Sequence, residues 1–471
     1  MTTSSIHFKI FQMNDRPLLR LGSCDADVWP STLAEQIHFK QTFLAKYHAA
    51  MSANNQKKLS FREEKDNDNQ NSGWRAFQPV PGKFVRELQD FLIIAGFLPA
   101  TETHGVFSYR TQAGARLFQE YVRTMEGRAD FFPPDGLVGN KTWAQIDRWK
   151  EQGLTSEWAG FTAQNPSPEY SVWLGLLAKA KSHYQANIGP VLQHVETLLS
   201  RPDAPKTGTR KIADWKTDAD TIHFIGLRRN EHSSVHRNDD LYVLLIRGLA
   251  FKFFGSTDPQ VDESHGKGRP FLTEGQHAYH FGWHKIHTKS GHPDRVYRAL
   301  KPSGNGVLVF RDRVDFNGSL STAEIARGLD PNPNPTINIH WAGMDASNFS
   351  AGCQVIAGLS YINHLNKLQD CSAFAARSYR DLAAGKTRGA YNIFTDLLLC
   401  FSPPGVQEIA YTLGRDESLF FVRSNGRTLC RSPRERTSPG SLIFKTRRFM
   451  SPTGLIKNRS RPENSGRLRS F

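Results

Sequence analysis

The hydrophobic and polar positions predict helices up to about residue 235 and strands after it. Apolar residues recur every three or four positions in "GKFVRELQDFLIIAGFLP", "GVFSYRTQAGARLFQEYV" and "DGLVGNKTWAQIDRW", which is the spacing of amphipathic helices. Glycine and Asp-Gly turns separate these stretches. We therefore expect three short helices, packed as a small bundle, within residues 79–150.

The segments on either side of this bundle differ from it in pattern. Residues 1–78 end in "NNQKKLSFREEKDNDNQNSGW", a polar and charged run that predicts a linker. Residues 151–235 return to helical spacing in "SPEYSVWLGLLAKAKSHYQAN" and "IGPVLQHVETLLSR". This segment is expected to be a helical connector without chemistry of its own.

The spacing of the apolar residues changes from helical to strand-like near residue 236. "DDLYVLLIRGLAFKFFGSTDP" contains two strand-like runs around Arg247-Gly248, as in a hairpin, and "GVLVFRDRVDF" and "TINIHWAG" add further strands. "GLSYINHLNKLQDCSAFAARSYRDL" predicts a helix, and "YNIFTDLLLCF" and "EIAYTL" predict closing strands. The expected fold class is multidomain α+β, with a β-rich domain at residues 236–430.

The length and charge of the chain limit the classes of protein to which it can belong. A chain of 471 residues exceeds what one hydrophobic core usually supports, and no apolar run approaches the length of about 18 residues that spans a membrane. Much of the net charge of +15 lies in residues 431–471, where eleven Lys and Arg accompany two Glu. This Ser- and Pro-rich segment predicts a disordered basic tail, and we expect no nucleic-acid partner.

The five cysteines are widely spaced and odd in number. They form no CxxC pair, so neither a disulfide framework nor a structural zinc site is predicted. The start of the chain lacks a basic segment followed by an apolar one, so we expect no secretory signal.

The segment 79–150 resembles the three-helix peptidoglycan-binding domain that accompanies many wall-lytic enzymes. The resemblance rests on "VRELQ", "GVFSYRTQAGARLFQ" and "DGLVGNKTWAQI", and "EYVRTMEGRADFFP" is a longer connection than the family usually has. It implies binding to peptidoglycan. A generic helical spacer is the alternative.

The stretch "INIHWAGMDASNFSAGCQVI" carries the candidate chemistry. His340 follows a strand-like run, and Cys353 follows the small residues Ser350 to Gly352. An imidazole can take a thiol's proton and later protonate a leaving amine, while backbone N–H groups of a tight turn can stabilise an oxyanion. A buried structural thiol is the alternative.

This stretch resembles the L,D-transpeptidase catalytic domain, whose signature is a strand ending in histidine, a loop and a Ser-His-Gly-Cys turn. The resemblance implies that His340 is the base, Ser350 and Gly352 form the turn and Cys353 is the nucleophile. Three positions depart from the family: Trp341 replaces a usual glycine, Ala351 the second histidine, and Val355 a usual arginine or asparagine. These departures leave hydrolysis and cross-linking open as outcomes.

A second cluster of histidines lies in "HAYHFGWHKIH", which contains His277, His280, His284 and His287. Spacings of three and four on a helix would suit zinc, but the alternating aromatic residues and Gly282 favour a strand. We expect His280, His284 and Trp341 to contact substrate. We expect none of the histidines to bind a metal ion. A zinc-dependent amidase or peptidase stays open as an alternative.

Together these features predict a peptidoglycan-binding cysteine enzyme that acts on cell-wall stem peptides through an acyl-cysteine, without a cofactor. It would act as a carboxypeptidase, endopeptidase or transpeptidase. Without a signal peptide, we expect non-classical export to the periplasm or to a target cell wall, as for an antibacterial effector or a phage-type lysin. Its partners would be peptidoglycan and, for an effector, a delivery apparatus or an immunity protein. A non-catalytic wall-binding protein is the remaining alternative.

Overall fold

A computed structural model describes most of the chain between residues 16 and 415. The described ranges are 16–39, 78–128, 133–228, 238–259, 268–284, 297–314, 320–344, 350–403, 406 and 408–415. All of them belong to one compact unit, Met1–Ser424, which the contacts separate from Asn425–Phe471. The predicted polar linker and the predicted basic tail lie outside the described residues.

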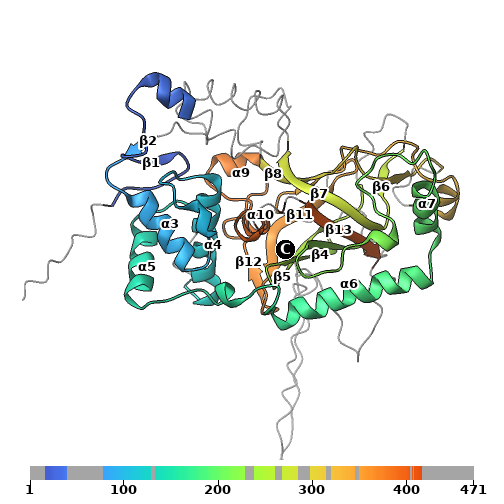
Figure 1. Cartoon of the computed structure of the whole chain (residues 1–471), viewed down its shortest axis with the longest axis horizontal. Helices are drawn as coiled ribbons and strands as arrows, with labels where there is room; N and C mark the ends of the chain where they lie inside the picture. Colours follow the sequence, from blue (N-terminus) through green and yellow to red (C-terminus); the bar gives the residue numbers. More distant parts are fainter. Residues whose placement is uncertain are drawn as a thin grey trace, which may run out of the picture. The chain divides into compact units, whose positions relative to one another are not determined.

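The first part of this unit contains a short strand pair followed by helices. Strands β1 (Ser23–Asp25) and β2 (Gln78–Val80) are parallel, and each of the three stretches with helical spacing forms a helix (Figure 1). The helices are α3 (Phe84–Ile94), α4 (Tyr109–Met125) and α5 (Asn140–Glu151), with a short 3₁₀ turn, η1 (Ala100–Glu102), between the first two.

Aromatic side chains hold these three helices together. Phe91 of α3 contacts Phe118 of α4 edge to face at a centroid distance of 5.0 Å, and Trp149 of α5 contacts Phe118 at 5.1 Å. Buried side chains of all three helices join one apolar core that continues into the sheet. Trp158 lies at this junction, with its ring 5.9 Å from Phe97 and 5.5 Å from Phe251.

The helical spacing in residues 151–199 is matched by helices, but the segment 151–235 is not helical throughout, because residues 222–228 form strand β3 of the sheet. The segment also contains η2 (Glu157–Gly160), α6 (Pro168–Ala186), α7 (Pro190–Leu199) and η3 (Ile212–Asp214). Helix α6 packs on β4 and β5 of the sheet (Figure 1). Ser167 caps its first turn by accepting a hydrogen bond from the Tyr170 N–H, which satisfies a backbone donor that the helix itself leaves unpaired.

A nine-stranded sheet dominates the rest of the described chain. Its strand order is β10-β8-β7-β13-β3-β4-β5-β11-β12, and an additional pairing between β10 and β11 closes eight of these strands into a ring. The strands are β3 (Ile222–Arg228), β4 (Asp240–Ile246), β5 (Leu249–Ser256), β7 (Gly275–His284), β8 (Tyr297–Pro302), β10 (Ile339–Trp341), β11 (Gln354–Ile362), β12 (Leu368–Asp370) and β13 (Glu408–Arg415). The described chain is thus a mixed α/β structure with a barrel-like sheet.

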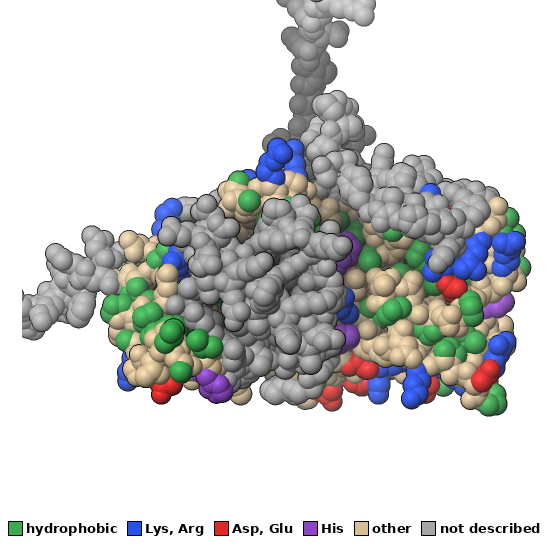
Figure 2. Space-filling view, turned by 90° about the horizontal axis from the view of Figure 1, so that it is seen from above, with side chains coloured by type: hydrophobic (Ala, Val, Ile, Leu, Met, Phe, Trp, Pro, Cys, Tyr) green, Lys and Arg blue, Asp and Glu red, His purple; other side chains and the backbone are tan. Residues whose placement is uncertain are grey.

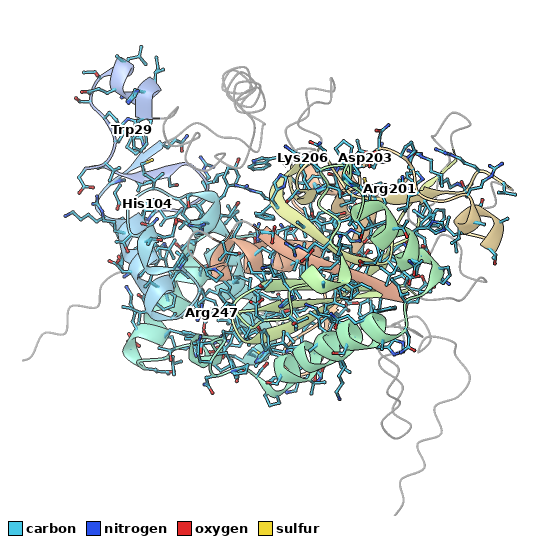
Figure 3. The ribbon with its side chains drawn as sticks, turned by 45° about the vertical axis from the view of Figure 1, so that its right-hand side comes forward. Trp29, His104, Arg201, Asp203, Lys206 and Arg247 are labelled. Atoms are coloured by element: carbon cyan, nitrogen blue, oxygen red, sulfur yellow. The ribbon has the colours of Figure 1, made fainter. Side chains whose placement is uncertain are left out.

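The predicted hairpin around Arg247-Gly248 is confirmed. It joins β4 to β5, and both turn residues have positive φ angles, 48° and 73°, as the tightest two-residue hairpin turns require. A side chain at Gly248 would meet the Thr162 carbonyl oxygen. Arg247, labelled in Figure 3, lies over the Phe401 ring at 4.6 Å.

Shorter elements surround the sheet. Strands β6 (Pro270–Leu272) and β9 (Val309–Arg311) form an antiparallel pair. Three further helices are α8 (Thr322–Ala326), α9 (Tyr379–Ala383) and α10 (Ala390–Phe401), and residues 33–39 are helical as well. Helix α10 packs against α4, β11 and β4. No described helix combines the length and the apolar character needed to cross a membrane.

Two predicted elements are wrong. The stretch that starts at Gly358 was expected to be a helix but continues β11 and then forms β12, and "YNIFTDLLLCF" was expected to be a strand but forms α10. Nearly all residues of β11 and of α10 are buried, whereas β12 is largely exposed. Buried apolar runs lack the periodicity that distinguishes a strand from a helix.

Candidate active site

Cys353 lies directly before β11, where the sheet closes on itself. Strands β10 and β11 are parallel, and Ile339 is in register with Gln354. The Gln354 N–H donates to the Asn338 carbonyl at 2.9 Å, so continuing the register by one residue places Cys353 beside Asn338.

His340 and Cys353 share one side of this strand pair. Residues in register on neighbouring strands point to the same face, and the face alternates with every residue. His340 is in register with Val355, two positions after the pair of Asn338 and Cys353. The two residues predicted from sequence to be base and nucleophile are therefore brought together on adjacent strands.

The His340 ring is fixed by its neighbours. Its Nδ1 lies 2.9 Å from the Trp341 carbonyl oxygen and 3.5 Å from the Tyr297 hydroxyl, and its ring stacks on His284 with centroids 4.2 Å apart. Because a carbonyl only accepts, the contact with Trp341 requires the proton on Nδ1. The neutral ring then keeps its lone pair on Nε2, which is the arrangement of a general base.

The Cys353 thiol is partly exposed and donates to the Thr336 carbonyl oxygen at 3.1 Å. Burial raises its pKa above the ordinary value, while hydrogen bonds from Asn338 and Ser350 and the charge of Lys301 act in the opposite direction without reversing the shift. The thiol is therefore protonated at neutral pH, and an attack by its sulfur requires a base.

The turn before the cysteine is tightly packed. Ser350 is buried, and its Oγ accepts a hydrogen bond from the Gly352 N–H at 3.3 Å. A Cβ at Gly352 would lie 2.6 Å from Pro270 Cγ and 3.2 Å from Ile337 Cδ1. Packing against β6 therefore requires glycine at position 352. Ala351 is partly exposed.

A row of polar side chains leads from β7 to the cysteine. His280 is in register with Lys301 across β7 and β8, and Lys301 Nζ donates to Asn338 Oδ1 at 3.4 Å. His280 Nδ1 lies 3.4 Å from the Ser303 hydroxyl, and burial together with the Lys301 charge lowers the pKa of His280. The row is thus His280, Lys301, Asn338 and Cys353.

Sequence reasoning missed Lys301 and Asn338. Asn338 could have been identified from the sequence, because it lies two residues before His340 on the same face of a predicted strand. No sequence pattern marks Lys301 as a site residue, because only the pairing of β8 with β7 and β10 brings it near Cys353.

The histidines of β7 occupy different environments. His280 and His284 are partly exposed on one face of the strand, as the alternation predicts, whereas His277 is fully buried. His277 contacts the Thr209 hydroxyl through Nδ1 and the Thr273 carbonyl through Nε2, each at 3.0 Å, and burial lowers its pKa to about 3. Figure 2 shows histidine side chains near the middle of one face of the molecule.

No three His, Cys, Asp or Glu side chains converge as metal ligands within the described ranges. His287, together with the neighbouring His265 and His292, lies outside those ranges.

Trp341, predicted to contact substrate, is 5% exposed. Its ring meets Tyr379 edge to face at 5.5 Å and Tyr297 at 6.3 Å, and the Arg388 guanidinium lies 5.4 Å from its centroid. Val355, which is in register with His340, is buried as well. Trp341 is therefore enclosed by aromatic rings and a guanidinium group.

Comparisons with protein-family models, curated proteins and solved structures find no match to this chain. The chemistry of the site is therefore argued from its own residues.

Proposed function

We propose that this protein is a cysteine-dependent enzyme that acts on cell-wall stem peptides through an acyl-cysteine intermediate. The observation that carries the proposal is the placement of Cys353 and His340 on one side of two adjacent parallel strands, with the His340 lone pair on Nε2. Because burial raises the pKa of the Cys353 thiol, its attack on an amide needs a base, and the imidazole of His340 is the group proposed to supply it.

In the proposed reaction, His340 Nε2 takes the proton from Cys353 Sγ as the sulfur attacks the carbonyl carbon of an amide. The carbonyl becomes an oxyanion, for which the N–H groups of the turn at residues 350–353 are the nearest candidates as donors. The intermediate collapses with cleavage of the C–N bond, and the imidazolium protonates the leaving amine. Water or a second amine then attacks the thioester and releases the cysteine.

The resemblance of two segments to wall-associated families supports peptidoglycan as the substrate. Helices α3 to α5 carry the motifs of the peptidoglycan-binding domain, and the described helices give those motifs the expected secondary structure. On the L,D-transpeptidase resemblance, the attacked carbonyl belongs to the diaminopimelate-type third residue and the leaving group is the terminal D-residue. Export to the periplasm or to a target wall, as an antibacterial effector or a lysin, is part of this proposal.

Mass spectrometry of muropeptides tests the proposal. Purified sacculi are incubated with the wild type, Cys353→Ala, His340→Gln and, as a matched control, His183→Gln, which changes an exposed histidine of α6. We expect Cys353→Ala and His340→Gln to lower the rate by about a thousandfold or more, and the control to keep it.

The product masses separate trimming, internal cleavage and cross-linking. The same incubations with a chelator separate this proposal from a zinc-dependent amidase or peptidase: products that persist in Cys353→Ala and vanish with chelator would contradict the thiol mechanism. Binding to sacculi without products from any variant would identify a non-catalytic wall-binding protein.

A further inference from the structure

Lys301 is a partly buried lysine beside the candidate nucleophile. Its Nζ donates to Asn338 Oδ1, and both Asn338 and Lys301 interact with the Cys353 thiol. The aliphatic part of its side chain lies over Gly282, where a Cβ would come within 3.1 Å of Lys301 Cδ. The absence of a side chain at position 282 thus leaves room for the lysine to extend along the sheet toward Asn338.

Within the described ranges, Lys301 forms no ion pair, unlike the more deeply buried Lys252, which pairs with Glu169. The Lys301 Nζ donates instead to the neutral amide oxygen of Asn338. Burial lowers the pKa of Lys301, because a desolvated ammonium without a counter-charge is disfavoured. A carboxylate placed at Nζ would compensate this cost and form a charge-assisted hydrogen bond.

The groups around Lys301 favour an anion over a cation. His280 faces Lys301 across the β7–β8 ladder, and Asn338 separates Lys301 from Cys353. A carboxylate bound at Nζ would lie near the Cys353 thiol, because the Lys301 charge acts on that thiol and Asn338 contacts both side chains.

We propose that Lys301 binds a carboxylate of the substrate, carried by a residue next to the amide that Cys353 attacks. This inference rests on the proposed function and specifies its substrate. Two carboxylates of a stem peptide have the required chemistry: the C-terminal carboxylate of the leaving residue and the side-chain carboxylate of the diaminopimelate residue. In the first case the enzyme selects free peptide ends, and in the second it selects the acyl residue.

The first experiment measures binding without turnover. The full chain is alkylated with iodoacetamide, and modification of Cys353 is followed by peptide mass spectrometry in the presence of N-acetyl-D-alanine or its neutral amide. We expect the acid to protect the wild type at a concentration about tenfold or more below that of the amide. Lys301→Met should abolish this preference, Lys301→Arg should restore part of it, and Lys367→Met, which changes an exposed lysine beside β12, should leave it intact.

An equal preference for the acid in the wild type and in folded Lys301→Met, or no protection by the acid at any soluble concentration, would overturn the inference. Thermal unfolding of each variant verifies that it is folded. If Lys301→Met does not fold, the comparison of Lys301→Arg with Lys367→Met decides, because an altered acid preference in the first alone supports the site and an unaltered one overturns it.

The second experiment identifies the source of the carboxylate and separates the two proposals. Turnover is measured with stem tetrapeptides in which the C-terminal or the diaminopimelate side-chain carboxylate is amidated. The amidation that raises KM in the wild type but not in Lys301→Met marks the bound group. Acid protection without turnover would contradict only the proposed function, whereas turnover of every peptide with unchanged KM in Lys301→Met would contradict only the role of Lys301.

Discussion

Burial decides the chemistry of the individual histidines. His277 and His280 are three residues apart in β7, but His277 is enclosed by threonine hydroxyl and carbonyl groups, while His280 lies at the surface beside Lys301. A fully buried imidazole loses solvation when it is protonated, so its neutral form is favoured. His277 therefore contributes to the stability of the fold, whereas His280 belongs to the candidate site.

This difference predicts an acid sensitivity. Because folding lowers the pKa of His277 from 6.5 to about 3, the unfolded chain binds more protons between these values. The stability that the neutral ring contributes is present above pH 6.5 and is lost as the pH falls toward 3, at up to about 1.4 kcal/mol per pH unit. His277→Gln should flatten this dependence.

Urea unfolding at several pH values measures the effect. The exposed His183 provides the control, since His183→Gln should retain the wild-type slope. A slope that is the same in His277→Gln and in the wild type would show that His277 does not titrate on unfolding.

The sequence suffices to select the candidate nucleophile and base but not the groups around them. Cys353 and His340 were selected because residues of reactive types flank a turn of small residues, and the strands place them on one face. Lys301 is 52 positions from Cys353 in the numbering, and nothing local marks it. Its position depends on which strands pair and in which register, which is information that single-chain patterns do not contain.

At the scale of elements, prediction succeeded where residue spacing or turn residues mark an element. Helices α3 and α4 have apolar residues at helical spacing, and Arg247-Gly248 marks the hairpin of β4 and β5 although both strands are buried throughout. It failed for β11 and α10, which are buried on nearly every side. In those elements tertiary packing, rather than a local pattern, selects the secondary structure.

Helix α10 is tied to α4 by a buried ion pair. Arg116 donates to both carboxylate oxygens of Asp396, at 2.6 and 2.9 Å, and the Asp396 side chain is 1% exposed. Replacing one partner leaves the other charge buried and unpaired, which costs about 3–5 kcal/mol. We expect Asp396→Asn to lower the free energy of unfolding by about that amount.

A double-mutant cycle tests this pair. Because a hydrophobic pair removes both charges at once, the variant that combines Arg116→Met with Asp396→Leu should be more stable than Asp396→Asn. If the double variant loses as much free energy of unfolding as the two single variants together, the two side chains are energetically independent.

At the scale of the whole molecule, the closed ring of strands and the helices share one apolar core. The core cluster extends along the chain from Leu19 to Leu413 and includes Leu88 of α3 and Tyr411 of β13. Prediction from sequence placed the helical segments and the β-rich segment in order along the chain, but the closure of the sheet through β10 and β11 could not be inferred, because it joins strands by long-range pairing.

Strand β13 has a central place in this sheet. It pairs in parallel with β3 over seven residue pairs and antiparallel with β7 over six. Deletion of residues 408–415 should therefore abolish the cooperative unfolding transition, because it opens the ring and leaves both β3 and β7 without a neighbouring strand on one side. Deletion of residues 425–471, which lie in the other unit, should leave the transition unchanged.

Circular dichroism during heating distinguishes these outcomes. If the wild type and the chain without residues 408–415 had the same melting temperature, this result would contradict a structural role for β13. A lower melting temperature on deletion of 425–471 would show that this unit stabilises the first.

The place of β13 also sets an order of events during synthesis. A ribosome releases the chain from its N-terminus, so β3, β4, β5, β7, β8, β10 and β11 all emerge before the strand that joins β3 to β7. Until residue 415 has left the ribosome, the ring is interrupted between β7 and β3. The strands that carry His340 and Cys353 are thus made before the strand that closes the ring, and the sheet that holds them is complete only once β13 has been made.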